Sequence, residues 1–74
     1  MKNLEEIIEE VLPYEVDDVV KYLSLLKIND IDSKYYVGID NVISSLMVLN
    51  KFDEELEKKL NHLQDLIRNK LSEV

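Results

Sequence analysis

The stretch Val42-Ile43-Ser44-Ser45-Leu46-Met47-Val48-Leu49 offers almost no polar face when it is drawn as a helix, although the chain around it is acidic and amphipathic. Gly38 and Asp40 precede this stretch and Asn50 follows it, and these residue types commonly start and end helices. A helix that is apolar nearly all round has to be covered on most sides. The cover comes from the rest of this 74-residue chain, from a second chain, or from both.

The spacing of apolar residues predicts three further helices around this central one. Two apolar stripes precede the central helix and one long stripe follows it. The stripes consist of Leu4, Ile7, Ile8 and Val11; of Val16, Val19, Val20, Leu23 and Leu26; and of Leu56, Leu60, Leu63, Ile67, Leu71 and Val74. We therefore expect helices at about 3–12, 15–27, 40–50 and 53–73, with an irregular segment at 28–38.

Three residues are expected to cap helices, and one proline is expected to interrupt them. Asn3, Asp40 and Asp53 stand where a side-chain oxygen can accept a hydrogen bond from the first turn of a helix. Pro13 disfavours the α conformation at Leu12 and cannot donate a backbone hydrogen bond. The first two helices are therefore either one helix kinked at Pro13 or two separate helices.

Together these patterns predict an all-α fold, a small four-helix bundle-like domain that occupies residues 1–74. A domain of this size buries only about 60% of the surface of its unfolded chain, so its stability is marginal without reinforcement. The chain has no cysteine and therefore no disulfide. Oligomerisation is another common reinforcement, and the sequence leaves both a monomer and a homodimer open.

The charge of the chain is strongly negative and unevenly distributed. Lys and Arg number 9 against 16 Asp and Glu, which gives a net charge of −7. No base lies between residues 5 and 18, but this segment contains Glu5, Glu6, Glu9, Glu10, Glu15, Asp17 and Asp18. Such a field repels nucleic acids and anionic membranes, and it favours a basic partner protein. We expect neither direct nucleic-acid binding nor membrane binding.

The sequence shows no sign of export or of membrane insertion. Its first residues turn acidic where a signal peptide would be apolar. The longest apolar runs are far shorter than the roughly 20 residues that cross a bilayer. The absence of cysteine fits a reducing compartment, so we expect a cytoplasmic protein.

Motifs for catalysis, metals and DNA binding are incomplete. Glu5 and Glu9 share one helix face, but no histidine stands near them to complete a carboxylate-bridged metal site. The only histidine, His62, has no cysteine partner and fits a solvent-exposed helix position. The stretch 37–46 resembles the turn and second helix of a helix-turn-helix motif, but residues 40–50 contain no base to contact DNA. We expect no enzyme activity, no metal and no cofactor.

The remaining features favour a surface that binds another protein. The acids between residues 5 and 18 are one candidate part of that surface. Tyr35 and Tyr36 are another, because partly exposed tyrosines are common at interfaces, although either ring could instead cover the small core. We expect a regulator, inhibitor or adaptor of a partner protein. The alternatives are an acidic nucleic-acid mimic that occupies a basic cleft, and a self-assembling structural protein that pairs through residues 42–49 and 56–74.

Overall fold

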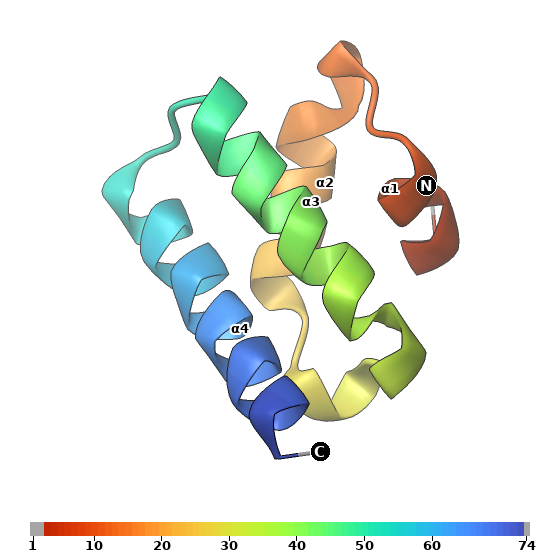
Figure 1. Ribbon diagram of the computed structural model, residues 1–74. Coiled ribbons are helices and arrows are strands. Elements are labelled where there is room, and N and C mark those ends of the chain that lie inside the picture. Colours follow the sequence, from red (N-terminus) through yellow and green to blue (C-terminus); the bar gives the residue numbers. More distant parts are fainter. Residues whose placement is uncertain (1–2, 74) are drawn as a thin grey trace.

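A computed structural model describes residues 3–73 of the protein, and within them the fold is all-α, as predicted. The α-helices of this part are α1 (Leu4–Glu9), α2 (Val16–Leu25), α3 (Tyr36–Leu49) and α4 (Glu54–Ser72) (Figure 1). Three short 3₁₀ turns lie between them: η1 (Pro13–Glu15), η2 (Ile28–Asp30) and η3 (Ser33–Tyr35). None of the helices in residues 3–73 is both long enough and apolar enough to cross a membrane.

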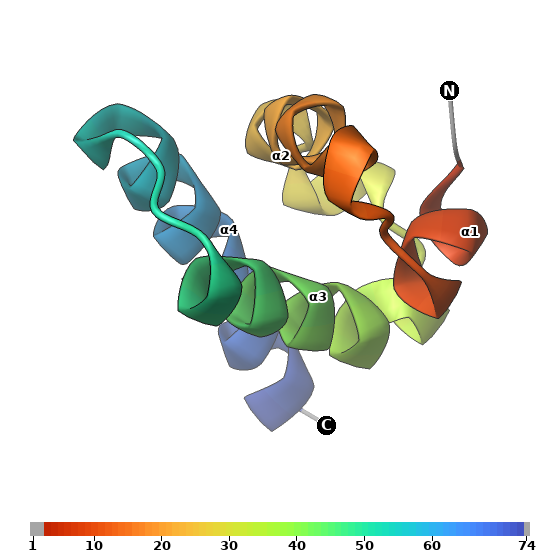
Figure 2. The same ribbon diagram turned by 90° about the horizontal axis from the view of Figure 1, so that it is seen from above.

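Helix α3 occupies the middle of the packing. It lies against α4 on one side and against α1 on the other, while α2 packs on α4 behind it (Figure 1 and Figure 2). Among the described residues, the buried apolar side chains form one cluster: Ile7, Val19, Val20, Leu23, Ile31, Ile39, Ile43, Leu46, Leu60, Leu63 and Ile67. The Cα radius of gyration is 11.5 Å, against about 11 Å expected for a compact domain of this length.

Side-chain caps begin α1 and α4 where the sequence predicts them. The Glu6 backbone N–H donates to Asn3 Oδ1 at 2.9 Å, and the Leu56 backbone N–H donates to Asp53 Oδ1 at 2.9 Å. Each bond satisfies one backbone donor that has no partner within its helix. The predicted caps Asn3 and Asp53 are therefore confirmed.

The segment around Pro13 separates α1 from α2. Leu12 adopts an extended conformation, with φ −77° and ψ 150°, because the proline that follows excludes the α region. Its backbone N–H donates to Glu15 Oε2 at 3.2 Å. Helix α1 already ends at Glu9, three residues before the predicted end at position 12. The two helices are thus separate, and a single helix kinked at Pro13 is excluded.

The start of α3 differs from the prediction. The helix begins at Tyr36 and not at position 40, so residues 36–38 of the predicted irregular segment are helical. Asp32 provides the cap for this region, since the Lys34 backbone N–H donates to its Oδ1 at 3.2 Å and opens the turn η3, which runs directly into α3. The prediction that Asp40 caps the helix is wrong, because Asp40 lies inside it.

Gly38 also lies inside α3 and serves close packing, not a turn. A Cβ atom at this position would stand 2.8 Å from Cδ1 and Cγ2 of Ile8. Among residues 3–73, no residue has a positive φ, so the glycine is not required by its backbone conformation. The resemblance of residues 37–46 to the turn of a helix-turn-helix motif does not hold, since the segment is continuous helix.

The stretch 42–49 is covered less completely than the sequence suggests. Ile43 and Leu46 are buried in the core, whereas the side chains of Val48 and Leu49 are 83% and 80% exposed. The apolar stripe of α4 is used within the chain, where its central residues join the core cluster. Val74, the last member of the predicted stripe, lies outside the described residues.

Candidate partner-binding groove

An open groove of about 590 Å³ lies along α2 where α1 packs beside it. Its lining consists of Ile7 from α1, Glu15 from η1, and Asp18, Val19, Lys21, Tyr22 and Leu25 from α2. Ile7 and Val19 are buried members of the core, and Tyr22 is half-buried. The edge of the hydrophobic core therefore forms the floor of the groove, while Tyr22 and Leu25 supply its accessible apolar surface.

The lining changes character along α2. Glu15 and Asp18 lie at the start of the helix and Leu25 is its last residue, with Lys21 between them. The Leu25 side chain is 75% exposed, although leucine is usually buried. One end of the groove is thus acidic and the other end is apolar.

The structure distributes the predicted acidic residues over three places. Glu15 and Asp18 line the α1–α2 groove, while Glu9 and Glu10 line a smaller groove of about 310 Å³ between α1 and α3. The remaining predicted acids, Glu5, Glu6 and Asp17, are exposed on the first turns of their helices and line neither groove. Their placement in a helix first turn is favourable because the positive end of the helix dipole stabilises negative charge.

Tyr35 and Tyr36 do not lie in an irregular segment as predicted, and of the two alternatives for their rings the structure supports the one in which they cover the core. Tyr35 ends η3 and Tyr36 begins α3, and both half-buried rings pack against the hydrophobic core. The ammonium group of Lys34 lies 5.1 Å from the centroid of the Tyr35 ring. Neither tyrosine lines the α1–α2 groove, and their participation in partner binding stays a prediction.

Leu25 was not among the residues predicted for a candidate site. The signal was present, because Leu25 is off the apolar stripe of α2 and therefore on its otherwise polar side. The neighbouring Ile7 and Val19 were assigned to the core only, which is correct for their burial. These two residues also form the floor of a groove because α1 lies beside α2. The relative position of the two helices cannot be predicted from local sequence patterns.

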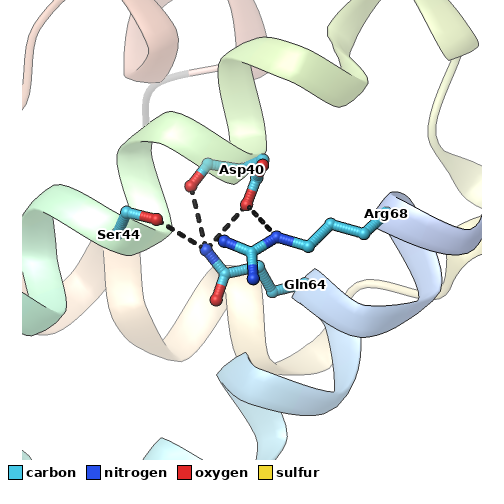
Figure 3. A network of polar contacts seen from close by, with 4 residues as sticks. All are labelled: Asp40, Ser44, Gln64 and Arg68. Atoms are coloured by element: carbon cyan, nitrogen blue, oxygen red, sulfur yellow. Dashed lines mark hydrogen bonds and ion pairs between the residues drawn. The ribbon is translucent and has the colours of Figure 1, made fainter. Parts of the chain in front are cut away.

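A polar network that the sequence did not predict joins α3 to α4 (Figure 3). The Gln64 Nε2 group lies 2.7 Å from Asp40 Oδ1, 2.7 Å from Ser44 Oγ and 3.2 Å from the Asp40 carbonyl oxygen. Arg68 Nε donates to the same Asp40 Oδ1 at 3.3 Å. Gln64 is 7% exposed, so the network replaces the water contacts that its buried amide loses on folding. The network fixes the position of α4 along α3.

The described residues offer few groups for chemistry. Within residues 3–73, no three His, Asp or Glu side chains gather in a way that could hold a metal ion. His62 is exposed on α4. The α1–α2 groove combines apolar contact with two carboxylates, and this is a combination suited to binding.

Searches against models of protein families, against curated protein sequences and against solved structures find no match to this chain.

Proposed function

We propose that this small four-helix, bundle-like protein binds a basic amphipathic segment of a partner protein in the α1–α2 groove. Through this contact it acts as a regulator, inhibitor or adaptor of the partner. The observation that carries the proposal is the exposed Leu25 beside an apolar groove that bears Glu15 and Asp18 at its other end.

The apolar part of the groove supplies most of the binding free energy. Burying one leucine-sized side chain of a partner contributes about 1.5–3 kcal/mol. Ion pairs at an exposed rim contribute about 0–1 kcal/mol each, because water and salt screen them. A partner that offered basic residues alone would therefore bind weakly, whereas a helix with apolar and basic residues would use both parts of the groove.

The arrangement of charges sets the direction of the bound segment. Basic side chains of the partner gain most near Glu15 and Asp18, within the field of the exposed acids of α1. Lys21 would repel a base placed over the middle of the groove. The partner's apolar side chains are thus expected towards Leu25, and its basic side chains towards the start of α2.

The test uses a fluorescent synthetic peptide of about 14 residues, made of Leu and Lys in an amphipathic helical pattern. The L25Q variant removes the apolar rim without changing the charge, and we expect it to weaken peptide binding about tenfold. The D17N/D18N variant should weaken binding several-fold and reduce its dependence on salt. Fluorescence anisotropy at several salt concentrations measures both effects.

The matched control is E55Q/D65N, which makes the same change in net charge at two exposed positions of α4. We expect it to bind the peptide nearly as the natural sequence does. If this control loses as much affinity as D17N/D18N, the peptide senses net charge alone and the groove is not its site.

The nucleic-acid mimic remains the alternative, because the seven acids between residues 5 and 18 are a dense array of negative charge. Mimicry would depend on the carboxylates and not on Leu25. Undiminished peptide binding by L25Q, together with lost binding by E9Q/E10Q/D17N/D18N, would favour the mimic over the proposed groove.

A further inference from the structure

The outer face of α3 is an apolar surface that the fold leaves open. Its exposed residues are Val37, Asn41, Ser45, Val48 and Leu49. In Figure 1 this helix crosses the front of the molecule with no other element before it, and in Figure 2 the C-terminal end of α4 extends beyond it on that side. Three of the five exposed residues are large aliphatic side chains. Their exposure to water is unfavourable, and burial against another surface would stabilise this face.

This face carries no charge, although 34% of the residues of the chain are charged. The only charged residue of α3 is Asp40, which is turned towards α4 and held by Gln64 and Arg68. A basic partner would gain no ion pair here. Two copies of a protein with a net charge of −7 repel each other, so they can approach most favourably through an uncharged surface. The chemistry of this face therefore fits a second copy of the same chain.

We propose that α3 pairs with α3 of a second copy in antiparallel orientation, about a two-fold axis at the middle of the helix. Asn41, Ser45 and Val48 follow one another at spacings of four and three residues. This is the spacing of a helix seam that packs onto a partner helix. The resulting dimer is isologous, which is the commonest form of self-association.

The antiparallel register places complementary side chains opposite each other. Asn41 faces Ser45 of the second copy, and the amide and hydroxyl groups can exchange a hydrogen bond across the axis. A polar pair at the seam of two helices favours one register over its alternatives.

The smaller groove lies beside this seam. It runs between α1 and α3, and its lining includes Asn41, Ser45 and Leu49 from α3 and the exposed Glu9 and Glu10 on the other side, so the uncharged part of the surface is the α3 side. Val37 and Leu49 flank the seam and would be covered on its two sides. The seam residues line no part of the α1–α2 groove, so self-association and partner binding use different surfaces.

An interface one helix wide falls at the small end of specific protein interfaces, which corresponds to a weak and reversible dimer. The first test is sedimentation equilibrium from about 10 µM to about 1 mM. The weight-average mass should rise from 8.7 kDa towards twice that value as concentration increases. The rise should be larger at high salt, because salt screens the repulsion between two acidic copies.

The variant V48K should remain near the monomer mass over this whole range, since it places two charges at the seam of the dimer. Val48 is 83% exposed, so the variant should keep the helical circular dichroism of the natural sequence. The control N69K makes the same change in charge at an exposed position of α4 and should dimerise as before. A mass of 8.7 kDa for the natural sequence at every concentration and salt, or equal behaviour of V48K and N69K, would overturn the proposal.

The register is tested with single cysteines, since the natural chain has none. A mixture of N41C and S45C, one of them isotopically labelled, is treated with a short bismaleimide and the products are weighed. With equal amounts of the two variants, random pairing would make the mixed N41C–S45C product half of the total, and the antiparallel register predicts clearly more than half, because only this pair lies in one layer. An N69C homodimer in equal amount, or a mixed product of half the total or less, would contradict the antiparallel register.

Discussion

Close packing at Gly38 determines how α1 lies on α3. The space that a Cβ would need is occupied by Cγ1, Cγ2 and Cδ1 of Ile8, all within 2.9 Å. Two of these atoms are attached directly to the Ile8 Cβ, so relieving the contact requires a different Ile8 rotamer or a shift of α1. A glycine in a helix interior is a local disadvantage, and here the contact with α1 compensates for it.

The G38A variant should therefore be destabilised. In an exposed helix interior, replacing Gly by Ala stabilises a protein by about 1 kcal/mol. At position 38 the overpacking against Ile8 costs about 1–3 kcal/mol, and we expect a net loss of about 1 kcal/mol in urea unfolding. The exposed control N61A should instead gain about 0.5 kcal/mol. A more stable G38A protein would show that the contact with Ile8 is not tight in solution.

Gln64 is the residue on which the polar network depends. Its amide group contacts three acceptor oxygens on α3, and the residues beside it on the same face of α4, Leu63 and Ile67, are buried. The sequence contained a signal, because Gln64 falls within the apolar stripe of α4, where a polar residue has to find partners. Those partners, Asp40 and Ser44, are 20 or more residues away and could not be predicted from local spacing.

The Q64E variant tests this network with almost no change in shape. It replaces the donating amide by a carboxylate that faces the carboxylate of Asp40, so we expect a loss of about 2 kcal/mol or more in stability. The control N69D adds the same charge at an exposed position of α4 and should change the stability by less than about 0.5 kcal/mol. Equal unfolding midpoints for the two variants would mean that the network contributes nothing.

At the level of elements, the sequence predicted the helices that begin with a strong local signal. Asn3 and Asp53 cap α1 and α4 as expected. The start of α3 was misjudged because Gly38 and Asp40 resemble a helix-start signal, while their real roles are contacts with α1 and α4. The actual cap, Asp32, is also a local feature, but it acts through η3 and not directly on α3.

The D32A variant should weaken the entry into α3. It removes the acceptor of the Lys34 backbone N–H, and loss of such a cap costs about 1 kcal/mol. D30A removes the same charge from the neighbouring turn η2 and serves as the control. We expect urea unfolding to separate the two variants by about 1 kcal/mol, and amide exchange to be faster at Tyr36 and Val37 in D32A only. Unchanged exchange at these amides would assign the start of α3 to another interaction.

For the molecule as a whole, the apolar segment that dominates the sequence is only half used by the fold. Its inner residues make the core, and its outer residues remain on the surface of α3. The sequence of residues 42–49 predicts that this segment packs against other elements. It does not predict which face remains exposed to solvent, because the exposed face depends on where α1 and α4 pack. The same reasoning applies to the α1–α2 groove, whose acidic and apolar parts come from two helices and a turn.

The two proposed associations should respond to salt in opposite directions. Attraction between the acidic protein and a basic segment weakens as ionic strength rises, whereas repulsion between two acidic copies is relieved. Anisotropy of the Leu/Lys peptide and sedimentation of the protein alone, measured in the same buffers, compare them directly. If peptide binding and self-association both strengthened, or both weakened, with rising salt, the assignment of one to an acidic groove and of the other to an uncharged surface would be wrong.

The most direct test of the proposed groove is to map where the Leu/Lys peptide binds on the isotopically labelled protein by nuclear magnetic resonance. If the peptide binds in the α1–α2 groove, the amide and methyl signals of Ile7, Val19 and Leu25 shift most on titration, with smaller changes along α4. Shifts that follow the acidic residues all over the surface, or that centre on Val48 and Leu49, would contradict binding in this groove.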